Sequence, residues 1–247
     1  MRLDQKLTLS AALFALAVPV ATEGAPGLLV GWETWTESGA DTWNATLLNG
    51  MSGQGKGTPE SGGSWFNFSN ATVANGASSD GTFGTFAGAV ADNTTNASND
   101  ATALSNGYDG FIDFTVTNTS LDAIELSAFH FDAGAFRPNA ANEWGLSVQS
   151  GAVTNGSVES STGPVTTAAA PIVDDYDIDL TGLADRTVGV GESVVFRLNW
   201  TGGTAPPASG GHHTFLDNVG ISGTVIPEPT SLALLGLGSL LVARRRR

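Results

Sequence analysis

Short segments in which apolar and polar residues alternate are the feature that most constrains the fold of this chain. In residues 111–117, Ile112, Phe114 and Val116 alternate with polar residues, so they would share one face of a strand. Residues 194–200 repeat the pattern, with valine, phenylalanine, leucine and tryptophan at every second position. The segment between the two chain ends shows no strong helical periodicity. These patterns predict an all-β protein.

Turn-forming residues separate the predicted strands. Glycine makes up 32 of the 247 residues, well above the usual share of about 7 %, and asparagine, serine and threonine are also abundant. We expect further strands at residues 28–35, 64–69, 82–90, 121–131, 143–149 and 215–225, and loops at residues 49–63, 91–107 and 201–211. The body, residues 25–225, is long enough for one antiparallel β-sandwich with its own core.

The C-terminal end carries three signals in a fixed order. Pro227-Glu228-Pro229 is followed by an uncharged, mostly apolar run at residues 230–243 and then by four arginines, Arg244, Arg245, Arg246 and Arg247. A helix of about 14 residues reaches about 21 Å, against a hydrocarbon core of about 30 Å. The helix would therefore span a membrane only if the bilayer became thinner around it or if flanking residues entered the hydrocarbon core. The arginines would hold their end in the cytoplasm and leave the body outside. The alternative to a membrane segment is a helix buried in the protein core, but a buried helix would give the four arginines no structural role.

This ordered tail resembles the PEP-CTERM sorting signal of Gram-negative bacteria, which membrane proteases called exosortases recognise. The resemblance implies that residues 226–247 are a sorting and anchor segment, with Pro227, Glu228 and Pro229 as the motif and the arginines as a cytoplasmic stop. It implies an exosortase as partner and transient anchoring in the inner membrane. After cleavage, the protein would remain at the cell surface or outside the cell.

The N-terminus is typical of a secretory signal peptide. Arg2 and Lys6 precede an apolar run at residues 7–20, and small residues follow. We expect residues 1–24 to be removed after Ala21 or Gly24. A transmembrane anchor is the alternative, but the apolar run is too short for one.

Charge and composition narrow the function. The chain has 24 acidic residues against 10 lysines and arginines, a formal net charge of −14, so nucleic acid is disfavoured as a partner. It has no cysteine and hence no disulfide framework. No nucleophile elbow, zinc pattern or nucleotide-binding loop occurs. We therefore predict no cofactor and no catalytic residues, and a protein that is not an enzyme.

Two functions remain open for the body. Residues 177–223 resemble the closing strands of the jelly-roll sandwiches found in many PEP-CTERM proteins and carbohydrate-binding modules, which implies a jelly-roll-like fold. The first reading is a structural or adhesive protein of an exopolysaccharide layer. The alternative is a glycan-binding module of that layer. Trp43 and Trp65 flank the glycine-rich segment and are the candidates for stacking on sugar rings at the surface.

Acidic and histidine residues raise the question of a metal. Asp175, Asp177 and Asp179 could offer oxygen ligands to calcium, but alternation places them in a flat row facing solvent, without the glycine of a calcium loop. Adjacent His212 and His213 would point to opposite faces of a strand. We predict no metal site.

Overall fold

The computed structural model describes residues 26–32, 35, 37–68, 101–161, 164–165, 167–168, 174–204 and 211–227. These residues form strands, turns and bends, and none of them is helical. Except for Pro227, they belong to one unit, Glu23–Ile226. The predicted signal peptide and nearly all of the sorting segment lie outside the described residues, as does the strand predicted at residues 82–90.

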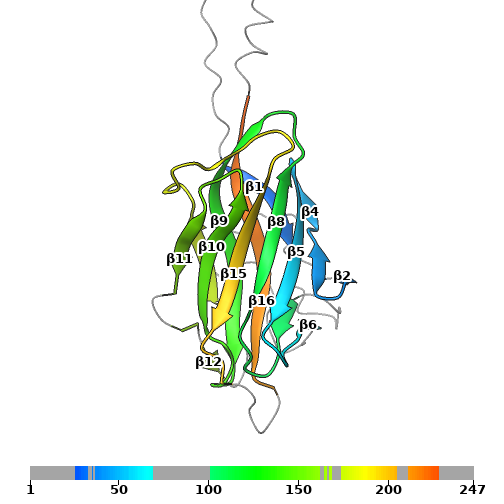
Figure 1. Ribbon diagram of the computed structural model, residues 1–247, viewed down its shortest axis with the longest axis vertical. Helices are drawn as coiled ribbons and strands as arrows, with labels where there is room; N and C mark the ends of the chain where they lie inside the picture. The colour runs from blue at the N-terminus through cyan, green and yellow to red at the C-terminus, as the bar shows by residue number, and fades with distance from the viewer. Residues whose placement is uncertain are drawn as a thin grey trace, which may run out of the picture. The chain divides into compact units, whose positions relative to one another are not determined.

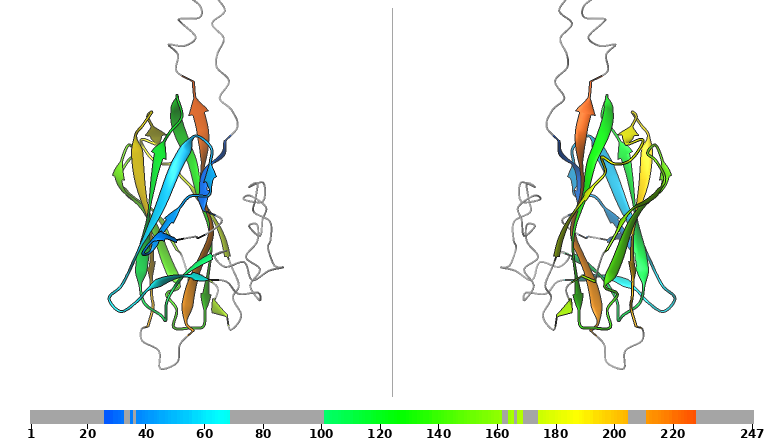
Figure 2. Two further views of the ribbon diagram at one scale, coloured as in Figure 1. Left: turned by 90° about the vertical axis from the view of Figure 1, so that its right-hand side faces the viewer. Right: turned by 90° about the vertical axis from the view of Figure 1, so that its left-hand side faces the viewer.

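Two sheets face each other around the core (Figures 1 and 2). Sheet A contains β1 (Gly27–Trp32), β4 (Leu47–Leu48), β6 (Trp65–Phe68), β7 (Ala101–Leu104), β9 (Ala123–Phe136), β12 (Thr167–Ala168), β13 (Asp174–Asp179), β14 (Thr187–Val188) and β16 (His213–Ile226). Sheet B contains β2 (Glu37–Gly39), β3 (Thr42–Asn44), β5 (Met51–Pro59), β8 (Gly110–Asn118), β10 (Glu143–Gly151), β11 (Gly156–Ser160) and β15 (Ser193–Thr201). The predicted all-β sandwich is confirmed, whereas its jelly-roll connectivity stays a prediction.

Two long strands organise sheet A. β9 and β16 pair antiparallel from His213 opposite Phe136 to Ile226 opposite Ala123. The other edge of β9 pairs in succession with β14, β13 and β12, of which only β12 runs parallel to it. The other edge of β16 pairs with β7 and β1. Sheet B is simpler, with the antiparallel order β11-β10-β15-β8-β5-β3-β2.

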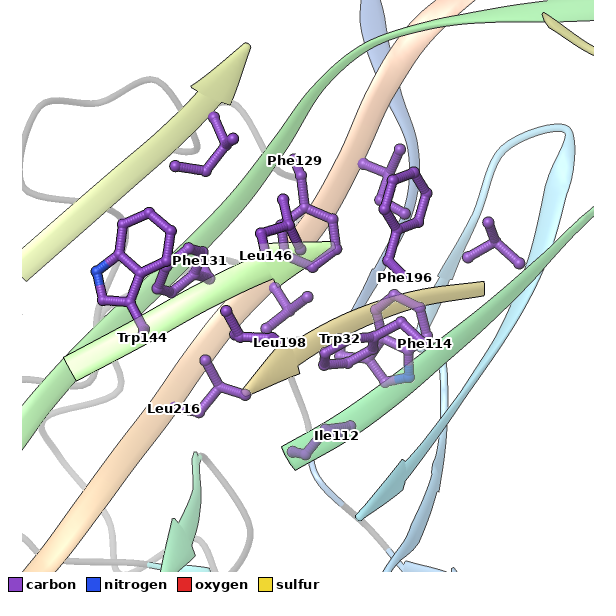
Figure 3. Close-up of a cluster of buried hydrophobic side chains, with 14 of the residues drawn as sticks. Trp32, Ile112, Phe114, Phe129, Phe131, Trp144, Leu146, Phe196, Leu198 and Leu216 are labelled. Carbon is purple, nitrogen blue, oxygen red and sulfur yellow. The ribbon is translucent and has the colours of Figure 1, made fainter. Parts of the chain in front are cut away.

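The alternating strands form the core, as their pattern predicts. Ile112, Phe114 and Val116 of β8 are fully buried, and so are the apolar residues of β15 beside them. From sheet A, Phe129 packs edge-on against Phe114, with ring centroids 5.8 Å apart. The ring centroids of Trp32 and Phe114 are 4.8 Å apart. Figure 3 shows these side chains meeting between the sheets.

The glycine-rich segment predicted as a loop at residues 49–63 is mainly a strand, and this prediction was wrong. β5 pairs with β8 along its whole length, and Gly53, Gly55 and Gly57 lie opposite the buried residues of β8. A β-carbon at Gly53 would lie 2.8 Å from the Trp32 ring, and one at Gly57 would lie 2.6 Å from the Trp65 ring. The glycines therefore make room for tryptophan rings. Residues 101–104, also expected in a loop, form β7.

Candidate functional site

Trp43 and Trp65, predicted as surface platforms for sugar rings, are buried, which corrects that prediction. Trp43 is fully buried and Trp65 is 3 % exposed. Their rings meet edge to face with centroids 6.3 Å apart. The cause is β5, because its inward glycine Gly57 leaves a space between the sheets that both rings fill. Neither ring offers a free face to a ligand.

The sorting motif begins where the last strand ends. Val225 lies opposite Ile124 and Ile226 opposite Ala123, so β16 stays paired with β9 up to its final residue. Pro227 follows immediately and is exposed. Glu228, Pro229 and the four arginines lie outside the described residues. No helix among the described residues is long and apolar enough to cross a membrane. The motif therefore joins the folded body without a spacer.

Three aspartates form a row across neighbouring strands of sheet A. Asp132 of β9 lies opposite Asp175 of β13 on one side and Asp217 of β16 on the other. Asp132 and Asp217 are each only 5 % exposed. Asn218 adopts a positive φ of 45° beside a register shift, and its Nδ2 donates to Asp132 Oδ2 at 2.8 Å. No local sequence pattern indicates this row, because it is assembled from three distant segments.

Burial governs the chemistry of this row. It raises the pKa of Asp132 from 3.8 to about 8, and the charge of Asp175 adds to the rise, while the hydrogen bond from Asn218 opposes it. Asp132 therefore carries its proton at neutral pH. Among the described residues, no group of three or more histidine, aspartate or glutamate side chains is arranged to hold a metal ion.

The other predicted polar candidates have identifiable partners. Asp177 lies opposite His130 and contacts its Nδ1. Asp179 accepts from the backbone N–H of Thr181 at 2.7 Å and from its hydroxyl at 2.9 Å, which lowers the pKa of Asp179. Ile178 is buried and Asp177 and Asp179 are exposed, as alternation predicts. Asp175, which was predicted to face solvent with them, is instead half-buried, and that part of the prediction was wrong.

The two adjacent histidines contact different loops. His212 Nδ1 accepts from the Asn139 backbone N–H at 3.3 Å, and His213 Nδ1 accepts from that of Asn106 at 3.4 Å. Burial lowers the pKa of His213, with the neighbouring His212 and Arg137 adding to the effect. The rings therefore serve separate loop contacts.

The outward face of sheet B carries a polar and aromatic cluster that the sequence analysis missed. Arg197 binds Asp113 through two hydrogen bonds of 2.7 and 2.8 Å, and its guanidinium carbon lies 3.6 Å from the centroid of the Phe111 ring. Two shallow depressions of about 270 and 460 Å³ lie beside this cluster, and Asn199 and Thr201 line both. The available signal was Phe111, an aromatic residue on the otherwise polar face of its strand.

Gly145 shapes the larger depression. A β-carbon there would lie 2.8 Å from Asn199 Oδ1, so glycine at this position lets the asparagine side chain lie across β10 without shifting. Serines from β10 and β11 and two glutamates, Glu143 and Glu159, complete the lining. The surface offers hydroxyl, amide and carboxylate groups, which suits hydrogen bonding to a polar, uncharged molecule.

Comparisons with known proteins identify the sorting motif in the tail but do not assign a function to the body. The family model of the PEP-CTERM protein-sorting motif matches residues 225–247. No curated protein matches the chain. One similar solved structure is TmCBM61 in complex with β-1,4-galactotriose, with 8 % identity, a TM-score of 0.34, and coverage of 68 % of this chain and 86 % of that one. Another is the K1 cleaved adhesin domain of Lys-gingipain from Porphyromonas gingivalis W83, with 14 % identity, a TM-score of 0.32, and coverage of 68 % and 89 %. At such low scores no site can be transferred from either structure.

Proposed function

We propose that this chain, which carries a PEP-CTERM protein-sorting motif at residues 225–247, is an exported surface or matrix protein with a non-catalytic, structural or adhesive β-sandwich. The motif indicates export and sorting by an exosortase. The observation that carries the proposal is that this motif starts on the last two residues of β16, one of the two central strands of sheet A, and continues directly beyond the strand. The tail would anchor the body in the inner membrane until an exosortase cuts near Pro227-Glu228-Pro229.

Processing can be tested by mass spectrometry of the mature protein from a Gram-negative host that contains an exosortase. We expect the surface or released form to end near residues 227–229 and to lack all four arginines. A variant in which Pro227, Glu228 and Pro229 are all alanine should keep the tail and stay with the inner membrane. The matched control, alanine at exposed Glu60 and Ser61 in the β5–β6 turn, should be processed normally. A released wild-type form that retains its arginines would contradict the proposal.

A second candidate function is glycan binding by the outward face of sheet B. It is favoured by the cluster of Phe111, Asp113 and Arg197 and by the neighbouring Asn199, which lines both depressions. Here Asn199 would donate and accept hydrogen bonds with sugar hydroxyls, and Phe111 would supply apolar surface beside them. This location replaces the buried tryptophans as the candidate binding surface.

Glycan-array binding by the exported protein separates the two functions. If the body binds a glycan through this face, Asn199→Ala should weaken binding about tenfold, the effect of losing about one hydrogen bond. Glu37→Ala, at the far edge strand of the same sheet, is the matched control and should leave binding unchanged. No binding to any glycan would leave the structural or adhesive role.

A further inference from the structure

Three turns surround the end of the sandwich where β16 finishes (Figure 1). The β4–β5 turn and the β8–β9 turn are joined by hydrogen bonds from the N–H groups of Thr119 and Ser120 to the Gly50 carbonyl, at 3.0 and 3.1 Å. The β14–β15 turn joins through Gly191 N–H, which donates to the Asn118 carbonyl at 3.0 Å. The start of β9 pairs with the end of β16, which brings all three turns beside the exit of the chain toward its tail.

The Asn118 side chain joins two of these turns, the β8–β9 turn and the β14–β15 turn. Its side-chain amide donates to the carbonyls of Asp122 and Val188, each at 2.9 Å. Its side-chain oxygen accepts from the backbone N–H of Ser120 at 2.9 Å and from the Ser120 hydroxyl at 2.7 Å. The residue is 1 % exposed. One buried side chain therefore links two turns through four hydrogen bonds.

The tips of this end are aliphatic. Leu121 in the β8–β9 turn is 91 % exposed and Val190 in the β14–β15 turn is 51 % exposed. Val225, next to the last residue of β16, is 38 % exposed, and Leu48, which directly precedes the β4–β5 turn, is 60 % exposed. These four are the large hydrophobic residues that are exposed in the described part of the chain. Single exposed aliphatic residues are ordinary, but their collection at one end is not.

The chain beyond β16 limits what can cover this end. Ile226 closes the strand, and the uncharged, mostly apolar run that resembles a membrane anchor starts at Thr230. The intervening residues can span at most about 14 Å when fully extended. A bilayer's polar headgroup layer is about 6 Å thick on each side of its hydrocarbon core. While the tail is inserted, this end of the sandwich thus cannot move far from the lipid surface.

We propose that the four aliphatic residues Leu48, Leu121, Val190 and Val225 form a docking surface that rests on the outer face of the membrane before the tail is cut. The proposal rests on the anchored state proposed above. Asp122 and Glu192 lie among the tips, and Glu125 is already paired with Arg186 at 2.5 Å. The surface therefore carries no excess of positive charge and fits an electrically neutral lipid surface rather than an anionic one.

The absence of cysteine in the chain permits a direct test. Single-cysteine variants of the full chain, Leu121→Cys and Val190→Cys, are labelled with an environment-sensitive fluorophore and reconstituted into phosphatidylcholine vesicles. Ser61→Cys in the exposed β5–β6 turn is the matched control, because β5 starts beside the docking surface and ends away from it. We expect the labels at positions 121 and 190 to brighten severalfold and to be quenched by shallowly brominated lipid, while the label at position 61 does neither. Adding Leu121→Asp to the position 190 variant should abolish most of its quenching.

Each other result overturns the proposal in a distinguishable way. If the chain floats with the vesicles but labels at positions 121 and 190 behave like the label at position 61, the docking surface is wrong and the anchor stands. If the chain does not float, the anchored state fails as well. If the labels brighten with protein concentration and without vesicles, the surface binds a second copy of the chain. Stronger quenching in vesicles rich in phosphatidylglycerol than in phosphatidylcholine vesicles would overturn the proposed neutral lipid surface as the occupant.

Discussion

Replacing Asp132 by asparagine tests the buried aspartate row most directly. Asp132 lies between Asp175 and Asp217 in adjacent strands and is 5 % exposed. Burial first, and the charge of Asp175 next, raise its pKa from 3.8 to about 8. Asparagine has nearly the same shape, cannot ionise, and can still accept the hydrogen bond from Asn218. The substitution therefore removes the titration and keeps the packing.

The sign and size of the effect follow from proton linkage. In the unfolded chain Asp132 would lose its proton near pH 4, whereas in the folded protein it keeps the proton up to about pH 8. The folded state thus binds the extra proton over this range, and the free energy of unfolding falls by about 1.4 kcal/mol for each pH unit. At pH 7 the accumulated loss is about 4 kcal/mol. Asp132→Asn should be more stable than wild type by about that amount at pH 7, and nearly equal to it at pH 4.

Urea denaturation followed by tryptophan fluorescence, at several pH values between 4 and 9 in the presence of a chelator, measures this difference. Glu37→Gln, at an exposed edge strand, is the control, and its free energy of unfolding should change with pH as that of wild type does. A difference between Asp132→Asn and wild type that stays constant with pH would refute the reasoning, and so would a variant that is less stable at pH 7. We expect millimolar calcium to leave the melting temperature unchanged. A calcium-dependent rise of several degrees in wild type, absent from Asp132→Asn, would show that the carboxylate binds a cation instead of a proton.

Two further substitutions test the core and the turns. Asn118→Ala removes the side chain that joins two turns and leaves two carbonyls without their donor, so we expect a loss of about 2–4 kcal/mol in urea denaturation. The control Asn44→Ala, at an exposed strand end, should change the free energy of unfolding by less than about 0.5 kcal/mol. Equal losses from Asn118→Ala and Asn44→Ala would contradict the role of Asn118. Gly57→Ala pushes a β-carbon against the Trp65 ring and should destabilise the protein by about 1–3 kcal/mol. Gly182→Ala, with open space around it, should be nearly neutral; a neutral Gly57→Ala would show that the core around Trp65 is loosely packed.

The sequence by itself determined the fold class and the identity of the tail. The alternating pattern predicts β8 and β15 correctly because each strand has one face on the core and one face outside. Apolar residues therefore recur at every second position, which is the period of a strand. The tail is recognisable because its motif, apolar run and arginines are contiguous and need no tertiary structure to be read. Signals of both kinds are local.

Only the tertiary structure decided which residues are inside and which lie together. β5 could not be predicted from its sequence because its inward positions are glycines, which give no alternating hydrophobic pattern. Glycine is needed at these positions because the rings of Trp32 and Trp65, from other strands, occupy the space that a side chain would fill. The row of Asp132, Asp175 and Asp217 depends on the register of three strands that are far apart in the chain. Burial, and with it the raised pKa of Asp132, is a property of that assembly and not of any one segment.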